Sequence, residues 1–583
     1  MYEVHVRHTD FVPTTLAETR PPIFSIHATS DAATMQIQIA LNIVALAHRA
    51  IERLHYSDSV QTAWRLTTHH AKLASGPLPK FRLLSNADDP AFPLSRAISY
   101  LKYGQPRSLY WMKKQEQGKI ITVTEVEEAV NLDLGWRVEA RAQVSLTISG
   151  GVLADLPSFG YVISYRTSRM RHTLTALFSK TVTSIALLQS EYEQHTPDEL
   201  IQNNRKLKQK LPMLVDSAAT LIVCPPHIAL QWNTELRNFL SSEQYDVYDV
   251  RLIQSFGQLQ KLGMDDLQKS RVIVVSWSVF AEPEYISHIA DFTAMPEPSI
   301  SGRRAFETWF NRAMEEVPDQ LAELQSTTYE AFRNLAESKR VQRSKDDAFN
   351  LTLPITIQHG SAYKSFEDMQ TSLGSSMKNS KNKHQTKPKT MTPSHQAPLL
   401  HLFRFNRVII DEYHYLNTAK GLDNVVASVN VKQIAAYKRW LLSAMGNFSD
   451  VDQIASYLGI KLGRHCVDDS PSTARANKGR QSEATLVEDL LAQTEVRSRQ
   501  WHEARHQRAQ EFLDLFVRQN SASLQHITCT EKIVPVEMDI GHHAVYLELS
   551  QHLISQKMQI KKLNNKKNSD RIDRLNASLE NSE

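Results

Sequence analysis

Five short apolar runs, each followed by turn or helix signals, constrain the fold of this chain more than any other feature of its sequence. They are GVLAD (151–155), TLIVC (220–224), RVIVVS (271–276), RVIID (407–411) and RWLLS (439–443). Strands this apolar are buried on both faces, and helical patterns lie between them. The sequence therefore predicts an α/β fold, a doubly wound parallel sheet with flanking helices, in which ligands bind at the carboxyl ends of the strands.

Composition allows such a core and excludes some classes of protein. The chain has 583 residues, of which 41% are hydrophobic and 22% charged, so it is globular and not a disordered chain. Its net charge of +4 does not by itself indicate nucleic acid. Cys224, Cys466 and Cys529 stand far apart, which fits a reducing compartment and gives no zinc-finger spacing.

The N-terminal region, residues 1–95, is expected to be an extension of unknown role with mixed structure. Its longest apolar stretch, Met35 to Ile51, contains several polar residues and is too short for a membrane span, so we expect a packed helix and no membrane partner. A second helix is expected at residues 60–73. Residues 360–398 are rich in Ser, Lys, Asn and Pro, which predicts a disordered insertion acting as a flexible basic linker.

Two separated segments together have the composition of a phosphate-binding loop. GGVLADLPSFG (150–160) ends at Gly160, and KTVTSIALL (180–188) begins a helical pattern. In such a loop Gly160 would precede Lys180, which supplies charge to the phosphates, and Thr181, whose hydroxyl binds Mg²⁺. Removal of residues 161–179 makes the two segments contiguous, so we interpret these residues as an unspliced intron. The alternative is a true insertion that silences the site.

The segment RVIIDEYHYLN (407–417) places two carboxylates and a histidine at the end of a buried strand. In a nucleotide site Asp411 would hold Mg²⁺, Glu412 would activate the attacking water and His414 would link hydrolysis to movement. The alternative is that the two acidic residues cap a helix.

Taken in order, these motifs resemble the Swi/Snf-type helicase-like ATPases, a family of DNA-dependent translocases, and most closely its repair-associated subgroup. GQPRSLYWMKKQE, with Gln105, resembles the segment that opens the family's nucleotide site. LIVCPPHIALQWNTEL (221–236) resembles the motif that lies along DNA in the family and contributes Pro225, Gln231 and Trp232. VIVVSWSVF contributes Ser276 as a further DNA-binding candidate, and RWLLSAMGNF contributes Ser443 as a coupling residue.

The resemblance implies a RecA-like lobe at residues 96–463 and a helical region at 464–583 that leads towards a second lobe. It also implies ATP and Mg²⁺ as cofactors, double-stranded DNA or chromatin and nuclear proteins as partners, and a nuclear location. The predicted function is that of an ATP-dependent translocase in chromatin remodelling or DNA repair.

Several departures from the family pattern leave the enzyme activity open. Leu156 and Ser158 replace an acidic residue and a glycine, and Ala444 and Met445 stand where the family has Gly-Thr-Pro after Ser443. On the family pattern we also expect the residues given to contain neither the second lobe nor its arginine finger. We therefore expect impaired hydrolysis, with a non-catalytic DNA- or chromatin-binding scaffold as the main alternative and a metabolic phosphate-loop NTPase as a third.

Overall fold

The computed structural model describes part of the chain in detail. The described residues are 22–30, 35–54, 56, 59–71, 78–101, 104–156, 179–207, 213–298, 303–346, 349, 353, 398–418, 422–443, 451–460, 462, 497–520 and 539–555. Residues 161–178, the linker up to residue 397, and Gly160, Ala444, Met445, Cys466 and Cys529 lie outside them. The chain divides into two compact units, Met1–Leu524 and Gln525–Glu583.

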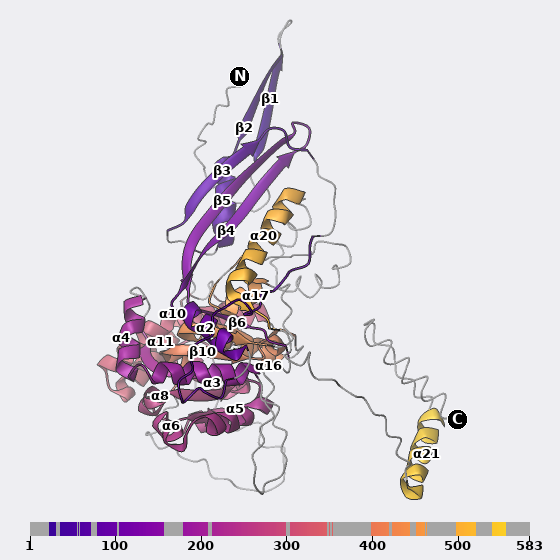
Figure 1. The fold of residues 1–583 in the computed structure, drawn as a ribbon. Coiled ribbons are helices and arrows are strands. Elements are labelled where there is room, and N and C mark those ends of the chain that lie inside the picture. Colours follow the sequence, from indigo (N-terminus) through magenta and orange to yellow (C-terminus); the bar gives the residue numbers. More distant parts are fainter. Residues whose placement is uncertain are drawn as a thin grey trace. The chain divides into compact units, whose positions relative to one another are not determined.

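A seven-stranded sheet forms the centre of the first unit (Figure 1). All of its neighbouring strands pair in parallel. Across the sheet the strands are β12 (Val517–Arg518), β6 (Gly150–Leu153), β11 (Ala435–Leu442), β10 (Phe403–Asp411), β7 (Val215–Cys224), β9 (Val272–Ser276) and β8 (Arg251–Ile253). The five predicted runs all lie in or at the ends of these strands, which confirms the strand assignments.

Successive residues of each strand enter two different apolar cores, one on each face of the sheet. In β7, Leu221 and Val223 belong to one core, whereas Ile222 and Cys224 belong to the other. This alternation is the consequence of a side-chain period of two in a sheet covered on both sides. The predicted class, a doubly wound α/β fold, is therefore confirmed, and the arrangement is that of a RecA-like or Rossmann-like sheet.

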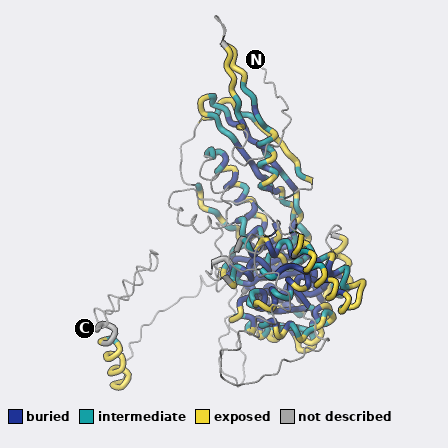
Figure 2. Tube along the Cα trace, turned by 180° about the vertical axis from the view of Figure 1, so that it is seen from behind, coloured by how far each residue is buried: buried dark blue, intermediate teal, exposed yellow. Residues whose placement is uncertain are grey.

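Helices cover both faces of this sheet. The core that contains Ile222 is closed by α2 (Gln105–Glu116), α3 (Ser179–Tyr192) and α5 (Pro226–Phe239). The opposite core is closed by α10 (Arg303–Ser326), α16 (Leu422–Gln433), α17 (Val451–Tyr457) and α20 (Arg499–Phe516), among others. The central strands and α3 are mainly buried, and Figure 2 shows the part of the molecule around the parallel sheet largely in dark blue.

The remaining helices connect or flank these elements. They are α4 (Pro197–Leu207), α6 (Ser242–Val247), α7 (Phe256–Leu259), α8 (Met264–Lys269), η1 (Trp277–Ala281), α9 (Pro283–Phe292), α11 (Tyr329–Ser344), η4 (Leu400–Leu402) and α15 (His414–Thr418). The second unit contains α21 (Ile540–Ser555). Among the described residues, none of the helices is both long and apolar enough to span a bilayer.

A three-stranded antiparallel sheet precedes the parallel one in the chain. Its order is β3 (Gln61–Thr67), β5 (Trp136–Ile148) and β4 (Lys119–Asn131), and α1 (Ile43–Leu54) packs on it. The predicted helix at residues 60–73 is therefore wrong. β3 pairs along its whole length with β5, a partner that local propensity does not reveal.

The predicted helix at residues 35–51 is wrong in its first half. Residues 35–41 form β2, which pairs with β1 (Phe24–Ser30), and α1 begins only at Ile43. The segment MQIQIAL alternates apolar and polar residues, which is the period of a strand and not of a helix. The apolar residues that continue beyond Leu41 into α1 hide this alternation within a longer apolar run.

A candidate site at the carboxyl edge of the sheet

Polar side chains gather where the parallel strands end. Because the strands all run in the same direction, their carboxyl ends share one edge of the sheet, and this edge is where open α/β sheets bind ligands. Ser276 ends β9, Asp411 ends β10, and Ser443 directly follows β11. Asp155 lies two residues beyond β6. We refer to Lys180, Asp411, Glu412, His414 and Ser443 as the carboxyl-edge cluster.

Lys180 lies in the first turn of α3, and its side chain is buried at this edge. Its ammonium group donates a hydrogen bond to the backbone carbonyl of Asp155 over 3.2 Å. Thr181 follows it and is also buried. Lys180 therefore lies beside the end of β6, whereas Gly160 lies outside the described residues.

Asp411 is buried and holds two hydrogen bonds. Its Oδ2 accepts from the indole N–H of Trp232 at 2.8 Å, and its Oδ1 accepts from the backbone N–H of Glu412 at 2.9 Å. Burial, followed by the charge of Glu412, raises the pKa of Asp411 to about 6, although Trp232 and Lys180 act to lower it. This carboxyl group therefore changes its protonation close to neutral pH.

Glu412 and His414 complete the acid–base part of the cluster. Glu412 has a φ of +50°, a left-handed conformation that is costly for a residue with a Cβ atom and that concentrates at functional sites. The Nδ1 atom of His414 lies 2.8 Å from the hydroxyl of Ser443 and 3.2 Å from a carboxylate oxygen of Glu412. Burial and the nearby Lys180 lower the pKa of His414, so its ring is mainly neutral at pH 7.

The predicted DNA-binding residues and Gln105 have different surroundings. Trp232 is buried on α5 and reaches Asp411, whereas Gln231 beside it is half-exposed. Pro225 is buried at the start of α5. Ser276 is buried, and its hydroxyl lies 2.7 Å from that of Ser278. Gln105 is buried at the first position of α2.

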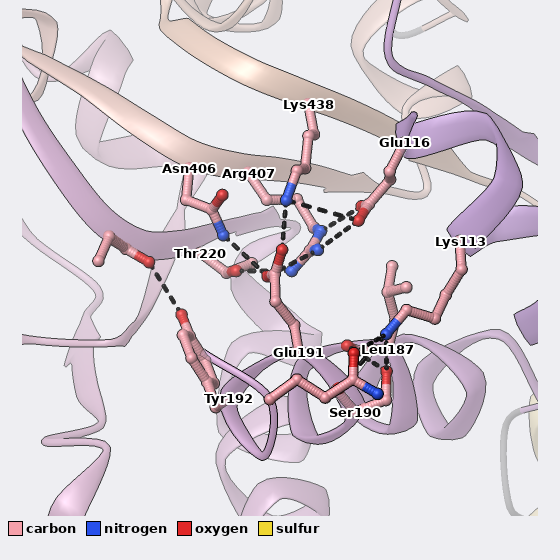
Figure 3. Close-up of polar contacts among 12 residues, drawn as sticks. Lys113, Glu116, Leu187, Ser190, Glu191, Tyr192, Thr220, Asn406, Arg407 and Lys438 are labelled. Carbon is pink, nitrogen blue, oxygen red and sulfur yellow. Dashed lines mark hydrogen bonds and ion pairs between the residues drawn. The ribbon is translucent and has the colours of Figure 1, made fainter. Parts of the chain in front are cut away.

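A buried ion network lies deeper on the same face of the sheet, and the sequence interpretation missed it (Figure 3). Arg407 has no exposed side-chain surface and donates to both carboxylate oxygens of Glu116, at 2.6 and 2.7 Å. It also donates to Glu191 at 2.9 Å and to the Thr220 hydroxyl at 3.2 Å. Lys438, opposite Arg407 on β11, pairs with Glu191 as well. Two cations and two carboxylates thus balance.

The network anchors two helices to the sheet. Glu116 is the last residue of α2, and Glu191 lies near the end of α3. Carboxylates at helix C-termini face the negative end of the helix dipole, so they require cations such as Arg407 and Lys438. Although burial acts to raise it, these two cations hold the pKa of Glu191 well below its usual range. The sequence does contain a signal for this network: the charged residues Arg407 and Lys438 stand inside the otherwise apolar segments NRVIID and YKRWLL. Because buried charges must be paired, such residues predict buried partners of opposite charge.

The described residues do not provide a metal centre or a reactive thiol. No group of three or more His, Cys, Asp or Glu side chains within the described ranges could hold a metal ion. Cys224 is fully buried, and burial together with Asp411 raises the pKa of its thiol well above the usual value. A thiol in this state is not a nucleophile, because the thiolate is the reactive form.

Two curated proteins that are similar to this chain carry the same name. No known family model matches the chain. The DNA (cytosine-5-)-methyltransferase DMT5 of Cryptococcus neoformans var. grubii is 31% identical over 611 residues, covering 96% of this chain and 24% of the relative. The protein of the same name from Verticillium dahliae is 24% identical over 501 residues, covering 79% of this chain and 20% of the relative. The chain thus spans at most about a quarter of these curated relatives.

These names overturn the predicted family and function. Relatives over nearly the whole chain are named DNA cytosine methyltransferases, so the Swi/Snf-type assignment and the predicted translocase, helicase-like and hydrolase activities are wrong. The predicted cofactors ATP and Mg²⁺ are wrong for the same reason, since methyl transfer draws on S-adenosylmethionine instead.

One solved structure is also similar. The Sulfolobus solfataricus SWI2/SNF2 ATPase core in complex with double-stranded DNA is 11% identical, with a TM-score of 0.28, and the match covers 86% of this chain and 60% of that chain. This likeness is too weak to support an argument about family.

Proposed function

We propose that this chain is a DNA-binding α/β region of a nuclear protein that methylates cytosine in DNA, and that it supports methylation without carrying out the transfer. The observation that carries the proposal is the 31% identity that extends over 96% of this chain but over only 24% of a DNA cytosine methyltransferase. Because the relatives are named DNA methyltransferases, we propose DNA as the main binding partner. Chromatin and nuclear proteins are further proposed partners.

The chemistry of the described residues supports an accessory role. Carbon 5 of cytosine is a weak nucleophile, so its methylation requires that a protein nucleophile first activate the ring. The one cysteine within the described ranges, Cys224, is buried with a raised thiol pKa and is unsuited to this step. We therefore do not propose Cys224 as that nucleophile, and we assign to the region the binding and orientation of DNA.

We place the ligand-facing part of the region at the carboxyl edge. Gln231, half-exposed on α5, is our candidate for direct contact with DNA. The buried Pro225, Trp232 and Ser276 would hold α5 and β9 in place beneath it. Lys180, Asp411, Glu412, His414 and Ser443 supply the acid–base groups of the same edge, and the buried Thr181 of α3 and Gln105 of α2 are further candidates.

Fluorescence anisotropy with a labelled duplex tests DNA binding. We expect saturable binding whose association constant falls as salt rises, because cationic groups displace counterions from the phosphates. Gln231→Ala is expected to weaken binding, whereas Thr327→Ala, at an exposed position just beyond α10, is expected to leave it unchanged. Absence of salt-dependent binding would overturn the proposal.

A second assay tests whether this chain itself transfers the methyl group. Incubated with S-adenosylmethionine and cytosine-containing duplex DNA, this chain alone is expected to transfer no methyl group. Methylated cytosine in the product would show that the chain itself is the transferase and would overturn the accessory role, even if DNA binding were confirmed.

A further inference from the structure

Asn520 follows β12 and makes an unusually complete set of hydrogen bonds for one buried side chain. Its amide nitrogen carries two hydrogens and has three acceptors within reach: Oδ1 of Asp155 at 2.7 Å, Oδ1 of Asn86 at 3.0 Å and the hydroxyl of Ser108 at 3.2 Å. Its amide oxygen accepts from the backbone N–H of Asn86 at 2.8 Å. Both ends of the side chain are therefore engaged.

The backbone of Asn520 also forms hydrogen bonds with residues 155 and 156, just beyond β6. Its N–H donates to Oδ1 of Asp155 at 3.2 Å, and its carbonyl accepts from the N–H of Leu156 at 3.1 Å. Asp155 and Asn520 are 365 residues apart in the sequence, so residues 155 and 156, which lie just beyond β6, are held by a distant part of the chain.

Asp155 links Asn520 to the carboxyl-edge cluster. The side chain of Asp155 is held by Asn520, and its backbone carbonyl accepts the hydrogen bond from Lys180. A change in the position of the Asp155 side chain is transmitted to its carbonyl, because the two belong to one residue that has no exposed surface. Two hydrogen bonds in series thus connect Asn520 with Lys180.

Residues 516–520 lie close to β6 because Gly151 has no side chain to keep the two backbones apart. A Cβ atom on Gly151 would lie 2.7 Å from the carbonyl oxygen of Phe516, the last residue of α20. β12 itself pairs with β6 over Val517 and Arg518 alone, and the N–H of Gln519 donates to the carbonyl of Leu84 at 2.8 Å. With such a short strand, Asn520 is the residue that fixes the carboxyl end of the segment.

We propose that Asn520 is a positioning residue for the carboxyl-edge cluster, which acts through Asp155 on the position of Lys180. The ordered state of residues 517–520 and the geometry of the cluster then depend on each other. This role does not rest on DNA binding, and its test does not require DNA.

The test measures how accessible the Lys180 amine is in the folded full-length chain. Asn520→Asp removes the donors and places a second carboxylate against Asp155, and Asn520→Ser is a milder variant that removes the amide alone. The rate at which acetic anhydride labels Lys180, relative to the partly exposed Lys339, is measured by mass spectrometry. We expect this ratio to rise about tenfold in both variants, the factor that corresponds to loss of one such hydrogen bond.

Rescue and control variants separate positioning from general destabilisation. The double variant Asn520→Asp with Asp155→Asn exchanges donor and acceptor and is expected to return the labelling ratio towards that of the unchanged chain. Asn204→Ala removes another buried amide, one that donates to Asn406 at 2.8 Å, and is expected to lower stability without changing the ratio.

Two results would overturn the proposal. One is an unchanged Lys180 ratio in folded Asn520→Ser. The other is an equal rise in Asn204→Ala, which would show that any loss of stability exposes Lys180. If Asn520→Asp does not fold, Asn520→Ser and the double variant still decide the question.

Discussion

The indole N–H of Trp232 lies 2.8 Å from a carboxylate oxygen of Asp411, and the two residues are 179 positions apart in the sequence. The bond joins α5, which covers one face of the sheet, to the end of β10 at the carboxyl edge. A hydrogen bond to an ionised acceptor is about twice as strong as a neutral one. The packing of α5 and the charge of Asp411 are therefore coupled.

Trp232→Phe tests this coupling. The variant keeps most of the apolar packing and removes the donor, and we expect it to lower the free energy of unfolding by ~1.5 to 3 kcal/mol at pH 7, the range for bonds to charged groups. Urea unfolding measures the change. Trp309→Phe is the matched control, because the Trp309 indole donates to the neutral carbonyl of Pro296. A loss in Trp232→Phe no larger than in Trp309→Phe would contradict the expectation.

Asp411→Asn tests the titration of the buried carboxyl group. Its pKa is raised from 3.8 to about 6 in the folded chain, so between these values the folded state binds a proton that the unfolded state releases. Proton binding to Asp411 therefore stabilises the folded state fully below the unfolded pKa of 3.8, and this stabilisation is lost as pH rises through the folded pKa of about 6. The asparagine variant cannot titrate, so relative to the unchanged chain it should gain ~3 kcal/mol between pH 4 and 7.

Unfolding curves recorded across this pH range measure that difference. Asp265→Asn is recorded beside it as the control, because it removes an exposed carboxylate from the surface of α8. A constant difference in stability between Asp411→Asn and the unchanged chain at all pH values would show that Asp411 does not titrate in this range.

Arg407→Met tests the buried ion network. The substitution leaves Glu116 and Glu191 buried without their main cation, and removal of one partner from a buried ion pair costs ~3 to 5 kcal/mol. Denaturant unfolding gives the value. Arg82→Met is the control, because Arg82 is largely exposed and lies 3.9 Å from Asp514, a geometry worth less than ~1 kcal/mol. Similar losses in the two variants would mean that the network does not contribute as its burial indicates.

Gly150→Ala tests the close contact between β6 and β11. Gly150 has a φ of +133°, and a Cβ atom there would lie 1.8 Å from the carbonyl oxygen of Arg439. We expect a loss of ~3 kcal/mol or more, or failure to accumulate as soluble protein, because neither backbone can move without breaking the sheet. Gly257→Ala, where the nearest atom lies 4.0 Å away, should be neutral or stabilise by ~0.4 to 1 kcal/mol in a thermal or urea unfolding assay.

The central sheet could be predicted from the sequence because its signal is local. Each of its main strands contains a continuous apolar run, and burial on both faces favours such runs. The antiparallel sheet could not, because β4 carries buried Glu125, Glu127 and Glu128, which read as exposed residues in the sequence. Glu127 pairs with Arg53 and Arg497, partners that only the fold brings near.

The same limit applies to the candidate site. The position of Asp411 and Glu412 at a strand end was predictable, and so was that of Lys180 at the start of a helix. The link from Trp232 to Asp411 and that from Asn520 to Asp155 were not predictable, because each joins residues separated by more than a hundred positions. The nature of the ligand was wrongly predicted, since motif order led to a family that the named relatives do not support.

Helix α3 fixes the spacing between the carboxyl-edge cluster and the buried ion network. Lys180 near its start bonds Asp155 at the carboxyl edge, and Glu191 near its end bonds Arg407 within the ion network. Eleven residues make three turns, so both side chains lie on one face of the helix, about 16 Å apart along its axis. Insertion or deletion of a single residue would rotate one end by about 100° relative to the other. The length of α3 between these residues is therefore fixed in steps of whole turns, and tolerated length variation is confined to segments outside it.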